Sequence, residues 1–159
     1  METRRIVINY TEYTNKSEMP ADEAALLARA EEMTASSYAP YSNFHVGAAV
    51  LMSNGEVFGG SNQENAAFPS GLCAERTAIY YASAQCPDEA VVAVAIAAEY
   101  KGKPTEDVPS PCGACRQVLL EAEQRAKNAI EVLLYGTDGV YIIRSIKDLL
   151  PLSFDESFL

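Results

Sequence analysis

The chain has 159 residues, a length that suits one domain with a single hydrophobic core. It carries 12 basic and 22 acidic side chains, a formal net charge of −10, and this excludes a typical nucleic-acid-binding protein because phosphate backbones require clustered positive charge. No stretch approaches the roughly 20 apolar residues that cross a bilayer, and no signal-peptide block is evident, so we expect no membrane partner.

The N-terminal part of the sequence predicts one long helix after a short arm. Residues 5–10 are an apolar stretch that fits an extra strand or an arm, and we assign residues 1–21 to such an N-terminal arm or strand. Residues 22–159 are predicted to be the main domain. Within it, residues 22–36 are predicted to be a helix, with acidic residues in its first turn and apolar residues at helical spacing: Ala25, Leu26, Ala30 and Met33.

The middle of the chain alternates strands and helices. Residues 44–52 and 56–60 flank Ser53-Asn54-Gly55, a turn sequence that predicts a hairpin. Residues 72–84 have the apolar spacing of a helix. Residues 90–98 are continuously apolar, which is typical of a buried strand.

The last third continues this alternation. A polar loop over residues 99–110 precedes a predicted helix over residues 112–126. Strands are expected over residues 130–135 and 140–143, and a short helix over residues 145–150. Such an alternation predicts an α/β protein with three layers, α/β/α, around a five-stranded mixed sheet.

Four residues have the types and spacing of a catalytic metal site. Cys73 and Glu75 lie close in sequence, and Cys112 and Cys115 follow three residues apart, as two ligands on one helix face would. A structural zinc site has four protein ligands, whereas a catalytic site leaves one position for water. Three cysteines beside a glutamate therefore indicate a metal-activated water with its proton shuttle.

Both cysteine clusters are predicted to lie at helix N-termini. Pro111 precedes Cys112, and the turn sequence Pro69-Ser-Gly71 precedes Cys73. The partial positive charge of a helix N-terminus favours thiolate over thiol. Zinc with three thiolates has a formal charge of about −1, so these helix ends and Arg76 would restore its attraction for water.

Several segments resemble the zinc-dependent cytidine deaminases, specifically the small homotetrameric class with three cysteine ligands. The similarity covers roughly residues 22–159. The segments that carry it are Tyr41-Ser-Asn-Phe44-His-Val-Gly-Ala-Ala-Val50, Ser61-Asn62-Gln-Glu64-Asn65-Ala66, Gly71-Leu-Cys73-Ala-Glu75-Arg76-Thr77-Ala78, Ser110-Pro-Cys112-Gly-Ala-Cys115-Arg116-Gln117 and Leu149-Leu-Pro151-Leu-Ser-Phe154.

The resemblance implies a zinc-dependent hydrolase of pyrimidine salvage that holds one Zn²⁺ per subunit through Cys73, Cys112 and Cys115. It would convert cytidine and 2′-deoxycytidine to uridine and 2′-deoxyuridine and release ammonia. Glu75 would carry protons between the zinc-bound hydroxide and the substrate. A cytoplasmic location is expected, because four cysteines without a paired framework indicate a reducing compartment.

Other segments are expected to select the substrate. Asn62 and Glu64 are two residues apart on an extended stretch, so they face one side, and both can hydrogen-bond a ribose hydroxyl. By resemblance, a backbone contact comes near Ala66, Phe44 stacks on the base, and Phe154 closes the pocket of a neighbouring subunit in a homotetramer.

Two further residues, Arg76 and Gln117, are expected to contact the cysteine ligands rather than the substrate. Phe68 stands where many relatives carry a tyrosine that reaches across the interface, which removes a polar contact there. His45 replaces a more usual proline.

Three alternatives remain open. The pair Cys112 and Cys115 alone could be a redox dithiol, although this explains neither Cys73 nor Glu75. A non-catalytic, zinc-stabilised interaction domain could recruit Cys86 or His45 as a fourth ligand. A deaminase of a cytosine-containing nucleoside antibiotic would share the zinc signature, whereas the pair Asn62 and Glu64 favours an ordinary nucleoside.

Overall fold

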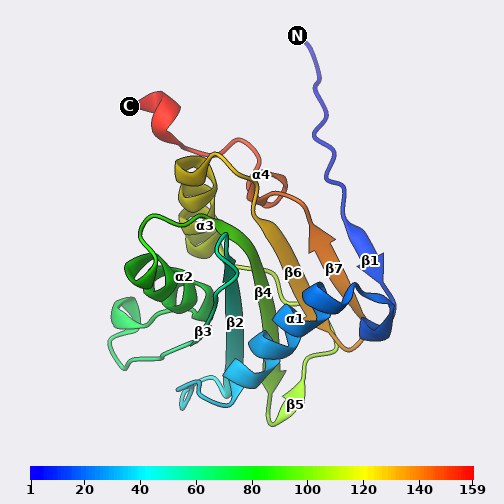
Figure 1. Cartoon of the computed structure of the whole chain (residues 1–159), viewed down its shortest axis with the longest axis vertical. Coiled ribbons are helices and arrows are strands. Elements are labelled where there is room, and N and C mark those ends of the chain that lie inside the picture. Colours follow the sequence, from blue (N-terminus) through cyan, green and yellow to red (C-terminus); the bar gives the residue numbers. More distant parts are fainter.

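The computed structural model describes residues 1–159 and contains one mixed sheet with helices on both faces (Figure 1). The strands follow the order β1-β7-β6-β4-β2-β3, and β5 pairs with β4. Strands β4 and β6 are parallel, and every other pair is antiparallel. The predicted three-layer α/β fold with a mixed sheet is confirmed, with seven strands in place of the expected five.

The helices and strands lie within two residues of their predicted positions, apart from two short strands. The strands are β1 (Thr11–Tyr13), β2 (Phe44–Met52), β3 (Val57–Ser61), β4 (Val91–Tyr100), β5 (Lys103–Pro104), β6 (Glu131–Gly136) and β7 (Gly139–Ile143). The α-helices are α1 (Ala21–Thr34), α2 (Ala74–Gln85), α3 (Gly113–Ala126) and α4 (Ile146–Leu149). None of them is long and apolar enough to cross a membrane.

The two short strands correct the sequence-based expectation. The first strand is β1 at Thr11–Tyr13, and residues 5–10 form none. Thr11 already pairs with Ile142, next to the last residue of β7, so the preceding residues have no neighbouring strand to bond. Strand β5 arises inside the predicted loop because Lys101 and Gly102 have positive φ (53° and 76°) and turn the chain back onto β4.

The central strand β4 shows how the two faces of the sheet differ. Its Ala93, Ala95 and Ala97 pack in the cluster that contains α1, whereas Val94 and Ile96 face the cluster that contains α2 and α3. Successive side chains of a strand point to opposite faces, so one apolar run serves two cores.

Two glycines allow the helices to approach the sheet closely. A Cβ atom on Gly47 of β2 would lie 2.0 Å from the Ala30 carbonyl oxygen of α1. A Cβ atom on Gly60 of β3 would lie 2.4 Å from the Ala78 nitrogen of α2. The second contact sets the position of α2, the helix that begins after Cys73.

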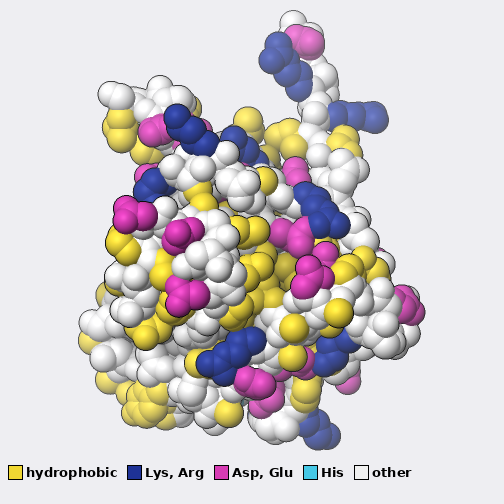
Figure 2. All heavy atoms as spheres, viewed as in Figure 1, with side chains coloured by type: hydrophobic (Ala, Val, Ile, Leu, Met, Phe, Trp, Pro, Cys, Tyr) yellow, Lys and Arg dark blue, Asp and Glu magenta, His cyan; other side chains and the backbone are white.

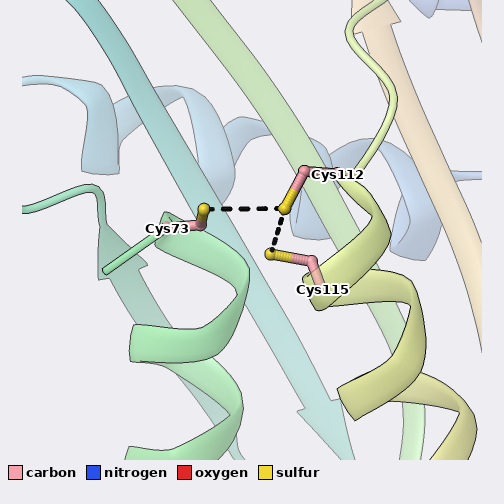
Figure 3. A group of neighbouring side chains, drawn as sticks. All are labelled: Cys73, Cys112 and Cys115. Carbon is pink, nitrogen blue, oxygen red and sulfur yellow. Dashed lines mark hydrogen bonds between the residues drawn. The ribbon is translucent and has the colours of Figure 1, made fainter. Parts of the chain in front are cut away.

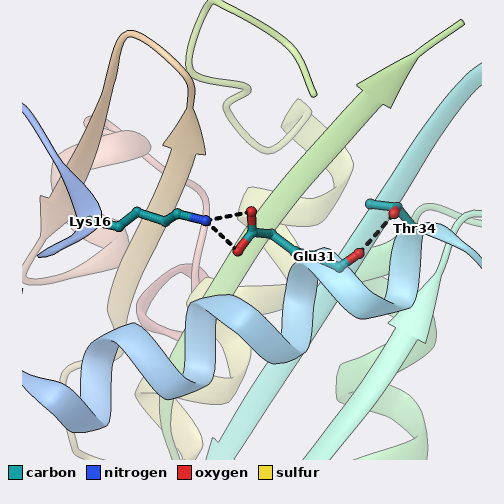
Figure 4. Close-up of polar contacts among 3 residues, drawn as sticks. All are labelled: Lys16, Glu31 and Thr34. Atoms are coloured by element: carbon teal, nitrogen blue, oxygen red, sulfur yellow. Dashed lines mark hydrogen bonds and ion pairs between the residues drawn. The ribbon is translucent and has the colours of Figure 1, made fainter. Parts of the chain in front are cut away.

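The segment before α1 is fixed to the body of the domain (Figure 4). Lys16 Nζ donates to both carboxylate oxygens of Glu31 on α1, at 2.7 and 2.8 Å. The same ammonium lies 4.4 Å from the centroid of the Tyr135 ring on β6. Thr34 Oγ1 donates to the Glu31 carbonyl oxygen. The chain between β1 and α1 is therefore held against the body of the domain.

Candidate active site

The three cysteines predicted to hold a metal come together at the N-termini of two neighbouring helices (Figure 3). Cys73 is the N-cap of α2, Cys112 is the N-cap of α3, and Cys115 lies in the first turn of α3. The Sγ atoms of Cys73 and Cys112 are 3.8 Å apart, and those of Cys112 and Cys115 are 3.5 Å apart. All three sulfur atoms lie within 4.8 Å of one another, so they can bind one ion.

The donor set fits zinc with an open coordination position. Three thiolates suit Zn²⁺, and a catalytic site retains one position that no protein ligand fills. Neither proposed fourth ligand joins the cluster: the Cys86 thiol donates to Glu56, and the His45 ring is hydrogen-bonded to Ser37. The closed, structural type of zinc site therefore lacks its fourth side chain here.

Positive groups surround the sulfur atoms. The Arg76 guanidinium donates to Cys73 Sγ at 3.6 Å. A hydrogen bond from the Cys115 thiol, followed by the contact with Arg76, lowers the pKa of Cys73, whereas donation to Cys73 and burial raise the pKa of Cys115. The partial positive charges of the two helix N-termini also favour thiolate over thiol. The site thus stabilises the thiolate form of Cys73 before any metal binds.

Glu75 is a buried carboxyl beside this cluster. It is the second residue of α2, and its side chain contacts Cys115. Only 5% of its surface is exposed, and burial raises its pKa above the ordinary value for a glutamate. A raised pKa brings a carboxyl closer to neutral pH, where it can both accept and release a proton.

A cavity of about 320 Å³ opens next to Cys73 and Arg76. Its wall carries both predicted ribose-binding residues, Asn62 and Glu64, together with two exposed aromatic side chains, Tyr41 and Phe68. The cavity is therefore lined both by the ribose-binding candidates Asn62 and Glu64 and by the metal-ligand candidate Cys73.

Asn62 and Glu64 also support the pocket wall. Asn62 accepts from the Val46 backbone at 2.8 Å and donates to the Phe44 carbonyl at 2.9 Å, which leaves one of its amide hydrogens free. Glu64 Oε2 accepts from the Tyr41 backbone nitrogen at 2.8 Å. Hydrogen bonds from the Ser42 side chain and the Tyr41 backbone lower the pKa of Glu64, so it is a carboxylate at neutral pH.

The remaining predicted substrate contacts lie outside this cavity. Phe44 lines a separate cavity with Tyr100, where the two ring centroids are 6.5 Å apart. Ala66 is exposed in the loop before Phe68. Phe154 is 60% exposed and stacks on Phe158 in the C-terminal segment. Within one chain, these residues do not converge on the cysteines.

Residues 20–130 match the family model described as the cytidine and deoxycytidylate deaminase zinc-binding region. The chain belongs to this family. All three clustered cysteines fall inside the matched zinc-binding region, so a zinc cofactor agrees with both the family and the donor set.

Individual relatives in the family cover most of the chain. A cytidine deaminase from Sporosarcina psychrophila is 36% identical over 138 residues, which are 87% of this chain and 95% of the relative. A cytidine deaminase from Halalkalibacterium halodurans is 45% identical over 100 residues, 63% of this chain and 71% of the relative. The crystal structure of cytidine deaminase from Burkholderia pseudomallei, 40% identical, has a TM-score of 0.70 and covers 86% of this chain and 100% of that chain.

Two residues of the family-like segment around Cys112 have contacts that the sequence did not reveal. Arg116 Nε donates to the Pro111 carbonyl at 2.8 Å, and its Nη1 donates to the Leu149 carbonyl at 2.6 Å. Gln117, expected to contact the cysteine ligands, donates instead to the Phe154 carbonyl at 3.0 Å. The carbonyls of Leu149 and Phe154 are more than 30 residues away in sequence, so no local pattern reveals these two contacts. The start of α3 is thus tied to α4 and to the C-terminal segment.

Proposed function

We propose that this protein hydrolytically deaminates cytidine and 2′-deoxycytidine to uridine and 2′-deoxyuridine, with release of ammonia, in pyrimidine salvage. The observation that carries the proposal is the convergence of Cys73, Cys112 and Cys115 beside the buried carboxyl of Glu75. Similar proteins named cytidine deaminase support the choice of substrate.

In this proposal the three thiolates hold zinc and Glu75 moves protons. Zinc held by these thiolates would supply a water of lowered pKa near neutral pH. The Glu75 carboxylate accepts a proton from the attacking water and donates a proton to N3 of the cytosine ring. It would then accept the remaining proton of the hydroxyl group added at C4 and deliver it to the amine, which departs as ammonia. Each transfer returns the carboxyl to the protonation state that the next one requires.

The pocket wall would bind the ribose. The free amide hydrogen of Asn62 can donate to a sugar hydroxyl, and the carboxylate of Glu64 can accept from one. Phe44 would stack on the cytosine base, and the backbone near Ala66 would complete the sugar site. Arg76 would moderate the charge of the thiolates rather than touch the substrate.

We infer that the active enzyme is a homotetramer in which neighbouring subunits complete each pocket. Phe154 and Phe68 are 60% and 78% exposed, large values for aromatic side chains, and a neighbouring subunit would cover them. Light scattering should give about four times the chain mass of 17.2 kDa. A monomer with full activity would contradict the shared pocket, because Phe154 would then have no pocket to close.

Residues 22–159 form the catalytic domain in this proposal, and residues 1–21 are an N-terminal arm that adds β1 to the sheet. The four cysteines are free thiols, and a metal site of thiolates requires reduced sulfur. We therefore place the enzyme in the cytoplasm.

The first test is a comparison of the zinc-loaded protein with its Glu75→Gln variant. The native protein should lower the ultraviolet absorbance of cytidine, and Glu75→Gln should turn over roughly 10²- to 10⁴-fold more slowly while it retains stoichiometric zinc. The exposed Glu121 on α3 provides a matched control, because Glu121→Gln should keep full activity.

Two outcomes would argue against the proposal. If the native protein holds zinc but changes neither cytidine nor 2′-deoxycytidine, the substrate is another amino-pyrimidine or the module is not an enzyme. If Glu75→Gln deaminates cytidine at the native rate, Glu75 is not the proton carrier.

A further inference from the structure

A second groove lies far from the cysteine cluster, on the α1 face of the sheet. It has a volume of about 350 Å³, and its floor is apolar. Figure 2 shows hydrophobic side chains gathered in a hollow on this face, with acidic side chains beside it. The apolar lining consists of Leu26, Leu51, Val92, Ala93, Ala129 and Leu133.

The rim of this groove carries uncompensated negative charge. Asp22, Glu23 and Glu131 line it together with one cation, Arg144. Arg144 bonds Glu131 and reaches Glu23 Oε1 only at 4.0 Å. Glu23 Oε2 is buried and has no hydrogen-bond partner. A buried carboxylate oxygen without a donor is costly, so the groove favours a ligand that brings a cation.

Residues 1–10, the part of the N-terminal arm that precedes β1, have side chains complementary to this groove. Ile6, Val7 and Ile8 are 58%, 71% and 46% exposed, an unusual run of large aliphatic side chains in water. In an extended segment alternate side chains share one face, so Arg4 lies on the same side as Ile6 and Ile8. Glu2 lies on this side as well, and its carboxylate accepts from Arg4 Nη2 at 3.3 Å in an exposed pair, so the arm offers an exchangeable guanidinium followed by two aliphatic side chains.

The arm and the groove lie at the same end of the sheet. Thr11 pairs with Ile142 near the end of β7, and Arg144 of the groove follows directly after that strand. The arm nevertheless extends away from its own domain (Figure 1). Tyr10 fixes this direction through its contact with Tyr141, with ring centroids 4.8 Å apart.

We propose that residues 4–8 of one copy bind the α1-face groove of a second copy. Arg4 pairs with Glu23, and Ile6 and Ile8 cover the apolar floor. Because arm and groove lie at the same end of the molecule, a twofold axis there lets each copy receive the arm of the other. This contact is separate from the cysteine pocket, so it stands or falls independently of deaminase activity.

Photo-crosslinking of the full chain tests this contact directly. Ile6 is replaced by the photoreactive amino acid p-benzoylphenylalanine, the zinc-loaded protein is irradiated, and products are separated under denaturing conditions. We expect a band at twice the chain mass of 17.2 kDa, with the crosslinked peptide from residues 20–29 or 128–144 by mass spectrometry. A crosslink to the same peptides within one chain, to another surface, or no crosslink would overturn the proposal.

Charge variants provide a second readout. Glu23→Gln and Arg4→Gln should each weaken the doubled band roughly fivefold, the usual order for one ion pair. Arg29→Gln is the matched control, since Arg29 pairs with Glu32 on the exposed side of α1 and lines no part of the groove. Equal bands for Arg4→Gln and Arg29→Gln would contradict the role of Arg4. Deaminase activity should be unchanged in all three variants.

Discussion

At the scale of single residues, Arg76 places a positive charge beside the metal site. Its guanidinium donates to Cys73 Sγ, and its Nε is buried without a hydrogen-bond partner. Three thiolates would leave bound zinc with excess negative charge, and a neighbouring cation withdraws part of it. We therefore expect Arg76 to act mainly on the charge of the metal site.

The variant Arg76→Gln tests this role. It keeps a hydrogen-bond donor but removes the charge, so we expect the deamination rate or the zinc affinity to fall about 10- to 100-fold. Zinc titration and steady-state kinetics of the same sample measure both quantities. Arg29→Gln on the exposed side of α1 should change neither, and equal behaviour of the two variants would show that charge near the thiolates is unimportant.

At the scale of elements, the site depends on how closely α2 packs against the sheet. The backbone of α2 at Ala78 touches β3 at Gly60, where no side chain fits. Cys73 and Glu75 lie less than two turns before Ala78 on this helix. Any shift of α2 away from β3 therefore moves the metal ligand and the buried carboxyl together.

The variant Gly60→Ala should expose this dependence. The new Cβ would meet backbone atoms, which cannot move as a side chain can, so we expect about 1–3 kcal/mol of destabilisation. Thermal and urea unfolding measure the change. Gly113→Ala is a matched control, because a Cβ there meets nothing within 4 Å and alanine suits a helix start. If Gly60→Ala and Gly113→Ala were equally stable, the close contact between Gly60 and α2 would be contradicted.

The same scale shows what the sequence could predict. The apolar periods of α1, α2, α3 and the long strands are local signals, and each element lies within two residues of its predicted range. The sequence does not locate β1 and gives no sign of β5, because each short strand depends on a partner strand rather than on its own residues.

A similar division holds for the candidate site. The cysteine cluster and Glu75 were predicted from spacing and helix-start signals, and the structure brings the three sulfur atoms together. The contacts of Arg116 and Gln117 join segments more than 30 residues apart, so their partners could not be read from the sequence. The role of Phe154 depends on a second subunit and stays a prediction.

At the scale of the whole molecule, the metal would link two distant segments. Cys73 and Cys112 are 39 residues apart and belong to helices on the same face of the sheet. An ion bound by both binds the folded state only, because the unfolded chain does not present the three sulfur atoms together. Metal binding should therefore contribute to the stability of the entire domain.

Removal of zinc tests this expectation. A strong chelator should lower the stability by about 4 kcal/mol when free zinc had been near 1,000 times its dissociation constant, or by about 10 °C in Tm. Calorimetry with and without chelator measures the difference. Cys86→Ser should show the same difference, because Cys86 is bonded to Glu56 away from the cluster. If fully zinc-free protein had the same Tm as zinc-loaded protein, metal binding would not contribute to the stability of the domain.

The double duty of Asn62 has a consequence for how this protein could be varied. One side chain bridges β2 through Val46 and Phe44 and still has a hydrogen free for a ligand. In a library selected only for soluble expression, substitutions at Asn62 would already be rare, before any selection for activity. Within the protein, Glu64 holds only the surface loop at Tyr41 and Ser42. Substitutions at Glu64 should therefore survive selection for soluble expression and be lost in a later selection for activity. New sugar specificities are therefore more accessible through position 64 than through position 62.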